Sequence, residues 1–92
     1  MKSGSLSIIE KYSFIIRTKN RRKVLEYLGR APVPQTPTSI KQGLGMSLNV
    51  VSRALRELDR AGLIVCRTPK LTMGRLYEVS DQGKEILKLL DL

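Results

Sequence analysis

Apolar residues recur at helical spacing through the first third of the chain. Between residues 6 and 16, five of them share one helical face: Ile8, Ile9, Tyr12, Ile15 and Ile16. A second apolar stripe, at residues 24–28, follows a candidate N-cap at Thr18 or Asn20, and Gly29 is a candidate end for that helix. The pattern therefore predicts two amphipathic helices before residue 30.

A proline-rich connector, RAPVPQTP at residues 30–37, separates these helices from the rest of the chain. Proline removes a backbone donor and restricts the residue before it, so a helix is disfavoured there. The pair Thr36 and Pro37 is typical of a helix start, with an N-cap followed by proline at the first helical position. We therefore predict a short third helix over residues 37–43.

A fourth helix follows after a tight turn. Ser47 is its candidate N-cap, the helical pattern runs to Ala61, and Gly62 ends it. The turn before it is about four residues long and contains Gly45, which fits the helix-turn-helix arrangement. The third and fourth helices are therefore predicted to form such a pair.

The period of the pattern changes after residue 62. The segments LIVCR (63–67) and RLYEV (75–79) are rich in branched and aromatic residues and predict two strands. Ser80 and Asp81 then begin a last helix, in which Ile86, Leu87 and Leu90 share a face. The predicted fold class is α+β and mostly helical, with four helices, a two-stranded hairpin and a closing helix.

The fourth predicted helix has two sharply different faces. Its apolar face is formed by four residues: Val51, Ala54, Leu55 and Leu58. The opposite face spans a sector of roughly 60° and is formed by polar and basic residues: Asn49, Arg53, Arg56 and Arg60. The apolar face is expected to pack on the core, so the basic face is the one that needs an explanation.

The overall charge changes the picture of this face. The 92 residues include 17 Lys and Arg but only 8 Asp and Glu, which gives a formal net charge of +9 at pH 7. Such an excess attracts polyanions, meaning nucleic acid or an anionic membrane surface. Apolar content of 41% is ordinary for a globular domain, and the length suits one small domain with a modest core.

The composition also argues against several classes of protein. Histidine is absent and Cys66 is the one cysteine, so the sequence has no recognisable zinc site, no Cys–His nucleophile and no histidine general base. We therefore expect no enzyme, metal or cofactor. Cys66 is interpreted as a structural thiol rather than a redox sensor. No apolar run could span a bilayer and residues 1–14 lack the features of a secretory signal, so we expect a cytoplasmic, nucleoid-associated protein.

Two hypotheses compete for the basic face of the fourth helix. It is either a solvated surface, partly neutralised by Glu57 and Asp59, or a surface that contacts nucleic acid. An α-helix fits the major groove of B-DNA, where Asn49 can pair with adenine and Arg53 with guanine in bidentate fashion. Residues farther along the helix, Arg56 and Arg60, are better placed for phosphates. The flanking elements favour the second hypothesis.

Two other segments are strongly basic. The loop RTPKLTMGR (67–75) carries Arg67, Lys70 and Arg75 and no acid; it is either a mobile surface loop or a DNA contact, and its place beside the fourth helix favours contact. The cluster KNRRK (19–23) lies where cations oppose the helix dipole by ~0.3–1 kcal/mol each. Either phosphates compensate these cations or the preceding helix extends through them, and we favour phosphate contacts by Arg21 and Arg22.

Two strings of the sequence resemble a known family. They are TPTSIKQGLGMSLNVVSRALRELDRAGLI (36–64) and GRLYEVSDQGKEIL (74–87). The span from about residue 19 to 88 is similar to winged helix-turn-helix transcription regulators of the MarR/ArsR-like type, particularly the small archaeal ones. The resemblance implies a three-helix core with a two-stranded β wing, and extra N- and C-terminal helices. The cysteine and histidine ligands of metal-sensing ArsR-like proteins are missing here.

The resemblance also implies roles for particular residues. In the fourth helix, five residues are expected at the major groove or its flanking phosphates: Ser47, Asn49, Val50, Ser52 and Arg53. The cations of the wing are expected along the backbone or in the minor groove: Arg67, Lys70 and Arg75. Regulators of this type usually dimerise through terminal helices. The apolar residues there could also simply close the core: Ile8, Ile9, Tyr12, Ile15, Ile16, Ile86, Leu87 and Leu90.

The sequence therefore predicts a homodimeric, sequence-specific duplex-DNA-binding regulator, most simply a repressor. Residues 1–18 and 81–92 are expected to be helices that serve dimerisation, and residues 19–80 the DNA-binding winged helix. Asn49, Val50 and Arg53 are the expected base-reading residues. Two alternatives stay open: a nonspecific architectural DNA-binding protein and a winged helix that binds another protein. The few scattered aromatic residues offer no stacking platform for single strands, so duplex binding is preferred.

Overall fold

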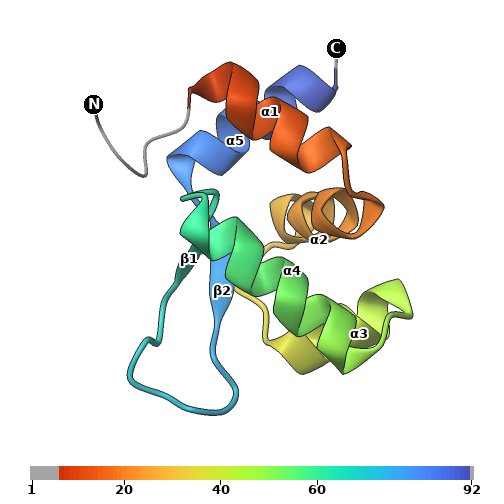
Figure 1. The fold of residues 1–92 in the computed structure, drawn as a ribbon. Helices are drawn as coiled ribbons and strands as arrows, with labels where there is room; N and C mark the ends of the chain where they lie inside the picture. Colours follow the sequence, from red (N-terminus) through yellow and green to blue (C-terminus); the bar gives the residue numbers. More distant parts are fainter. Residues whose placement is uncertain (1–6, 92) are drawn as a thin grey trace.

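The elements occur in the predicted order. The computed structural model describes residues 7–91. Residues 1–6 of the predicted N-terminal region, which include the first residue of the first predicted helix, and residue 92 of the predicted C-terminal region lie outside the described residues. The described part contains the following helices and strands (Figure 1): α1 (Ile8–Ile16), α2 (Lys19–Arg30), α3 (Pro37–Leu44), α4 (Leu48–Arg60), β1 (Ile64–Cys66), β2 (Tyr77–Val79) and α5 (Asp81–Leu90). The α+β, mostly helical class is confirmed.

Local hydrogen bonds explain where the helices begin. At α3, the Thr36 hydroxyl accepts the Ser39 amide and the Ser39 hydroxyl accepts the Thr36 amide, both at 3.1 Å, with Pro37 at the first helical position. The Ser47 and Ser80 hydroxyls likewise accept amides in the first turns of α4 and α5. The predicted starts of α2 to α5 are confirmed, including Thr18 before α2, although the Thr18 side chain makes no capping bond. Helix α1 begins later than predicted, at Ile8 after its N-cap Ser7.

The turn between α3 and α4 depends on one glycine. Gly45 follows the last residue of α3 with φ of 67°, in the left-handed region that side-chain-bearing residues avoid. Its amide and that of Met46 both donate to the Lys41 carbonyl, at 2.9 and 3.2 Å, which ends the helix. The chain can then start α4 at once, and the predicted helix-turn-helix pair is confirmed.

The core lies between α2, α3 and α4 and extends to the hairpin and the terminal helices. Its buried apolar residues are Ile15, Val24, Leu25, Leu28, Ile40, Val51, Ala54, Leu55, Leu58, Leu63, Ile64 and Ile86. All four residues predicted on the apolar face of the fourth helix are among them. Burial of that face fixes the rotation of α4, so its basic face must point outward.

The hairpin forms a wing beside α4. Strands β1 and β2 are antiparallel with Val65 opposite Glu78, and Gln35 of the α2–α3 connector forms two further 2.9 Å backbone bonds with Tyr77. Both strands are shorter than the predicted 63–67 and 75–79. At the wing end the Arg67 amide still donates to the Leu76 carbonyl at 2.7 Å, but the Leu76 amide donates to the Thr68 hydroxyl at 2.9 Å instead of completing the pair. At the other end the Leu63 amide donates to the Leu58 carbonyl of α4 at 3.0 Å. With this wing, the described residues form a winged helix-turn-helix.

The predicted end of α2 needs correction. The helix does not end at Gly29 but continues to Arg30. A Cβ atom at Gly29 would lie 2.5 Å from the Leu87 Cδ1 atom, so this glycine allows α5 to pack closely against α2. The less favoured alternative for residues 19–23, an extension of the first helix, is excluded, since α1 ends at Ile16 and α2 starts at Lys19 as a separate helix.

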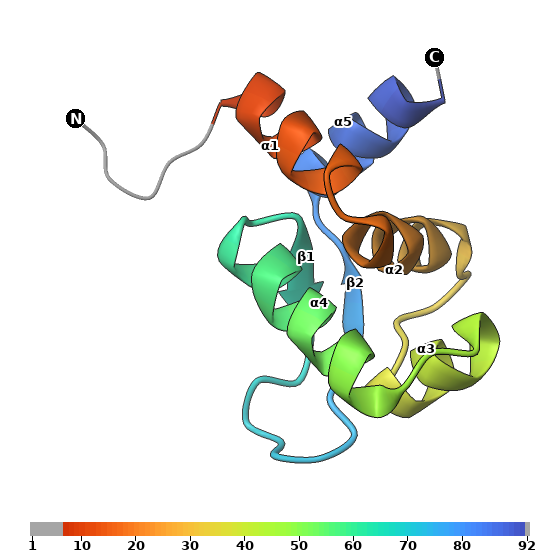
Figure 2. The ribbon, with the colours of Figure 1, turned by 45° about the vertical axis from the view of Figure 1, so that its right-hand side comes forward.

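The terminal helices α1 and α5 lie at the end of the molecule opposite the wing loop (Figure 2). Ile15 and Ile86, predicted to serve dimerisation, are fully buried core residues and so are closed to a partner. Three other predicted residues are half-buried against the core: Tyr12, Leu87 and Leu90. The remaining three, Ile8, Ile9 and Ile16, are exposed. None of the helices described here has the length and apolar character needed to cross a bilayer.

Candidate nucleic-acid interface

The outward face of α4 is polar and basic along its whole length. Asn49, Arg53, Arg56 and Arg60 are all exposed on the side opposite the buried apolar residues. Three further predicted contact residues lie at the N-terminal half of the helix: Ser47 is exposed, and Val50 and Ser52 are half-buried. The Ser47 hydroxyl accepts the Val50 amide at 3.3 Å, so it is part of the helix cap. The predicted residues of this helix are thus brought onto one continuous surface.

The arginines of this face are not neutralised by the acids beside them. Within residues 7–91, no ion pair involves Arg53, Arg56 or Arg60. Glu57 instead forms a 2.9 Å ion pair with Arg21 of α2. The hydrogen bond from Arg21 lowers the pKa of the Glu57 carboxyl, burial opposes this, and the charges of Arg21, Arg53 and Arg56 lower it further. The face therefore retains its positive charge.

Arg21 has a role inside the protein rather than on its surface. Its side chain is 17% exposed, and its Nη1 donates to the Phe14 carbonyl at 2.9 Å. The guanidinium also stacks over the Phe14 ring, 3.8 Å from the ring centroid. With the Glu57 pair, Arg21 thereby connects α1, α2 and α4. We therefore correct the expectation of phosphate contact for Arg21 and leave this residue out of the proposed interface.

The neighbouring cation, Arg22, stays at the surface. It is exposed and pairs with Glu26 one turn later on α2, at 3.1 Å. Such exposed pairs are weak, so the guanidinium can exchange its partner for a phosphate at little cost. A groove between this end of α2 and α4 is lined by residues of both helices: Thr18, Asn20, Arg21, Asn49, Val50, Arg53, Ala54 and Glu57. The α2 N-terminus therefore borders the first turns of α4.

The three cations of the wing differ in their surroundings. Arg67 forms a 3.2 Å ion pair with Glu78 of β2. Arg75 is half-buried, and its Nε donates to the Leu71 carbonyl across the loop. Lys70 is exposed and makes no ion pair within residues 7–91. Of the three, Lys70 is therefore the cation most available to a phosphate.

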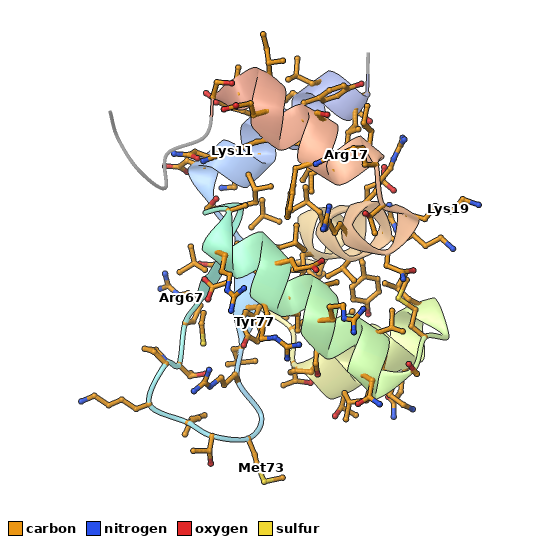
Figure 3. The ribbon with its side chains drawn as sticks, in the orientation of Figure 1. Lys11, Arg17, Lys19, Arg67, Met73 and Tyr77 are labelled. Atoms are coloured by element: carbon orange, nitrogen blue, oxygen red, sulfur yellow. The ribbon has the colours of Figure 1, made fainter. Side chains whose placement is uncertain are left out.

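Several surface residues between α4 and the wing were missed by the sequence analysis. A groove there is lined by Pro37, Thr38, Leu48, Ser52, Leu55, Arg56, Thr72, Met73, Gly74, Arg75 and Tyr77. Leu48 and Met73 are exposed apolar residues in its lining, and Leu71 is a further exposed apolar residue of the same loop. The signal in the sequence was a pair of apolar residues inside an otherwise basic and polar loop. Met73 points away from the body of the protein at the end of this loop (Figure 3).

The described residues contain no cluster of three or more acidic, cysteine or histidine side chains that could hold a metal ion. Cys66 is half-buried on β1. The residues described above provide hydrogen-bonding, cationic and apolar groups, a combination that suits binding to a polyanion with a structured surface.

Comparison with known proteins agrees with this geometry. A helix-turn-helix domain family matches residues 18–67, which is more than half of the chain. A solved crystal structure of a MarR family transcription regulator is 32% identical in sequence and superposes with a TM-score of 0.72. The match covers 80% of this chain but 49% of the other, so the chain spans about half the length of that protein. No curated protein matches the sequence significantly.

Proposed function

Because the chain belongs to the helix-turn-helix domain family and is similar in fold to a MarR family transcription regulator, we propose that it binds duplex DNA sequence-specifically and regulates transcription. Helix α4 would lie in the major groove, with the wing against the neighbouring backbone or minor groove. Residues 19–80 would form the DNA-binding unit. The terminal helices would join two copies, and the protein would reside on the nucleoid in the cytoplasm.

One observation carries this proposal: the outward face of α4 holds an exposed asparagine in the first turn and three exposed arginines that form no ion pair within residues 7–91. A merely solvated helix would gain from neutralising these charges, yet Glu57 is paired with Arg21 of α2 and Asp59 forms no ion pair within residues 7–91. The described residues therefore leave this face free for an anionic ligand. Duplex DNA provides both phosphates for the arginines and base edges for Asn49 and Arg53.

The residues would divide the work by their position along α4. Asn49, Val50 and Arg53 lie in the first half of the helix and would read base edges. The remaining polar residues would contact the phosphates and set the register of the protein on the duplex: Ser47, Ser52, Arg56, Arg60, Arg67, Lys70, Arg75 and Arg22. The simplest regulatory outcome is repression, because a bound protein blocks access of the polymerase.

Two copies would be related by a two-fold axis, placing two α4 helices about one turn of DNA apart on a palindromic site. Exposed Ile8, Ile9 and Ile16 on α1 support this part of the proposal, because apolar side chains at one end of a small domain favour association. Half-buried Leu87 and Leu90 could contribute from α5.

The experiment that tests the proposal is selection of bound sequences from randomised duplex DNA at two salt concentrations. An enriched palindromic motif at both concentrations is the expected result. Binding without enrichment, lost steeply as salt rises, would instead favour an architectural DNA-binding protein. Absence of binding even at low salt would contradict the proposal and favour a winged helix that binds another protein.

A further inference from the structure

The end of the wing loop is apolar, although the loop is basic. Met73 is 84% exposed and Leu71 is 47% exposed. They lie within residues 67–75, which carry three cations and no acid. Neither residue belongs to the buried core. Large apolar side chains at such a position gain from burial only if a partner covers them.

Hydrogen bonds within the loop give this end a defined shape. The Leu71 amide donates to the Thr68 carbonyl at 3.1 Å, and the Thr68 hydroxyl accepts the Leu76 amide at 2.9 Å. Arg75 donates to the Leu71 carbonyl from the other side of the loop. Gly74 has a φ of 67°, which permits the reversal directly after Met73. The loop therefore presents Met73 on a backbone that is already folded.

The position of Met73 indicates which partner would cover it. The groove between the loop and α4 contains Arg56 and Ser52, two of the proposed phosphate contacts. Lys70 is exposed three residues before Met73. The Met73 side chain lies among cations, and its loop contains no acid. This combination complements a ligand that has anionic groups on its outer surface and apolar groups behind them. The edge of a base-pair stack behind its phosphates has that character.

Resting on the function proposed above, we propose that Met73, supported by Leu71, inserts as a wedge into the minor groove and partly unstacks one base step. Methionine and leucine are among the side chains that proteins use in this way, and the unstacking kinks the duplex toward the major groove. Flexible pyrimidine–purine steps, TA or CA, unstack most easily. The wing would therefore select sequence through deformability at a step where it donates no hydrogen bond.

The test uses the full chain and a duplex recovered by the selection experiment, with 2-aminopurine replacing adenine at each TA or CA step in turn. Bound protein should raise the fluorescence at one step per protomer, because unstacking relieves quenching. Met73→Ala should abolish this rise at saturating protein and lower affinity about threefold to tenfold. DNA binding by the Met73→Ala variant should depend on salt in the same way as binding by the unmodified protein, since the variant loses no phosphate contact.

Two further variants separate the wedge from other effects. Met73→Leu keeps an apolar side chain of similar size and should retain the rise in fluorescence. Val33→Ala removes another exposed apolar residue (61% exposed), located in the α2–α3 connector, and should change nothing. A rise that persists in Met73→Ala would overturn the inference, as would tight binding by the unmodified protein without any rise. Those two results leave the proposed function intact, whereas failure to bind any duplex would remove both.

Discussion

Replacing Arg21 tests whether this arginine stabilises the fold or contacts DNA. The Arg21→Met variant keeps the apolar stem but removes three interactions: the Glu57 ion pair, the bond to the Phe14 carbonyl and the stacking on the Phe14 ring. A partly exposed ion pair contributes ~0.5–1 kcal/mol, a hydrogen bond ~0.5–1.5 kcal/mol and a cation–π contact ~0.5–1 kcal/mol. The free energy of unfolding should therefore fall by about 2 kcal/mol.

Acid should reduce this difference. The pKa of Glu57 is lowered from its ordinary value of 4.5, chiefly by the Arg21 hydrogen bond. The Glu57 carboxyl therefore binds its proton more tightly in the unfolded chain than in the folded protein. The ion pair with Arg21 stabilises the protein fully only above the pKa that Glu57 has in the unfolded chain. As pH falls through the lower pKa of the folded state, that stabilisation is lost. The carbonyl bond and the ring contact do not titrate, so part of the difference between Arg21→Met and the unmodified protein should remain.

Urea unfolding followed by circular dichroism, at neutral pH and at steps down to about pH 3, measures both effects. Arg22→Met is the matched control, because the adjacent Arg22 has only an exposed pair with Glu26 and should cost about 0.3–0.5 kcal/mol. In DNA binding, Arg21→Met should leave unchanged the slope of the logarithm of the binding constant against the logarithm of the salt concentration (the salt slope). A stability loss no larger than that of Arg22→Met, together with a reduced salt slope, would refute the structural role and restore Arg21 as a phosphate contact.

Three further predictions concern the interface and the assembly. Arg53→Ala should lower affinity for the selected site by ~1–3 kcal/mol and relax the preference at one base position, measured by repeating the selection; a uniform loss over all sequences would contradict base reading. Lys70→Ala should weaken binding to all duplexes alike and reduce the slope of log K against log salt by about 1; an unchanged slope would contradict its phosphate contact. Ile9→Glu, at a residue that is 76% exposed, should convert a dimer into a monomer in sedimentation velocity without loss of helical content; an unaltered mass would place the assembly surface elsewhere.

Local features of the sequence were sufficient to predict the order of the elements and to place their ends within two residues. Caps such as Thr36 and Ser47 act on amides within the same turn, so the residues that form them are close in sequence. The left-handed Gly45 is equally local. The two faces of α4 followed from periodicity alone, because burial of one face leaves no choice about the other.

The errors concern contacts between residues far apart in sequence. Gly29 was interpreted as a helix end because glycine often ends a helix. Its actual role, close packing against Leu87, depends on how α5 returns to α2 and is not visible in the local sequence. Ile15 and Ile86 were assigned to a dimer surface for the same reason, since their burial depends on how the terminal helices pack on the core. Arg21 looked like a free cation until its partner 36 residues away was placed beside it. Amphipathic spacing shows which residues seek burial but not which element buries them.

The same long-range contacts connect the two ends of the proposed mechanism. Arg21 joins Phe14 of α1 to Glu57 of α4, and buried Lys11 of α1 donates to Gln82 of α5 beside Gly62, just after α4. Helix α1 is thus connected to the last turn of α4, through Arg21 and Glu57, and to the residues just after it, through Lys11 and Gln82. If two copies associate through α1, packed side chains rather than a flexible linker set the distance between their α4 helices. The distance between the two α4 helices fixes the spacing between the two half-sites on the DNA. A dimer built through α1 therefore predicts a single half-site spacing in the selected motif. A mixture of spacings would require that the two copies associate through a contact outside this packed core.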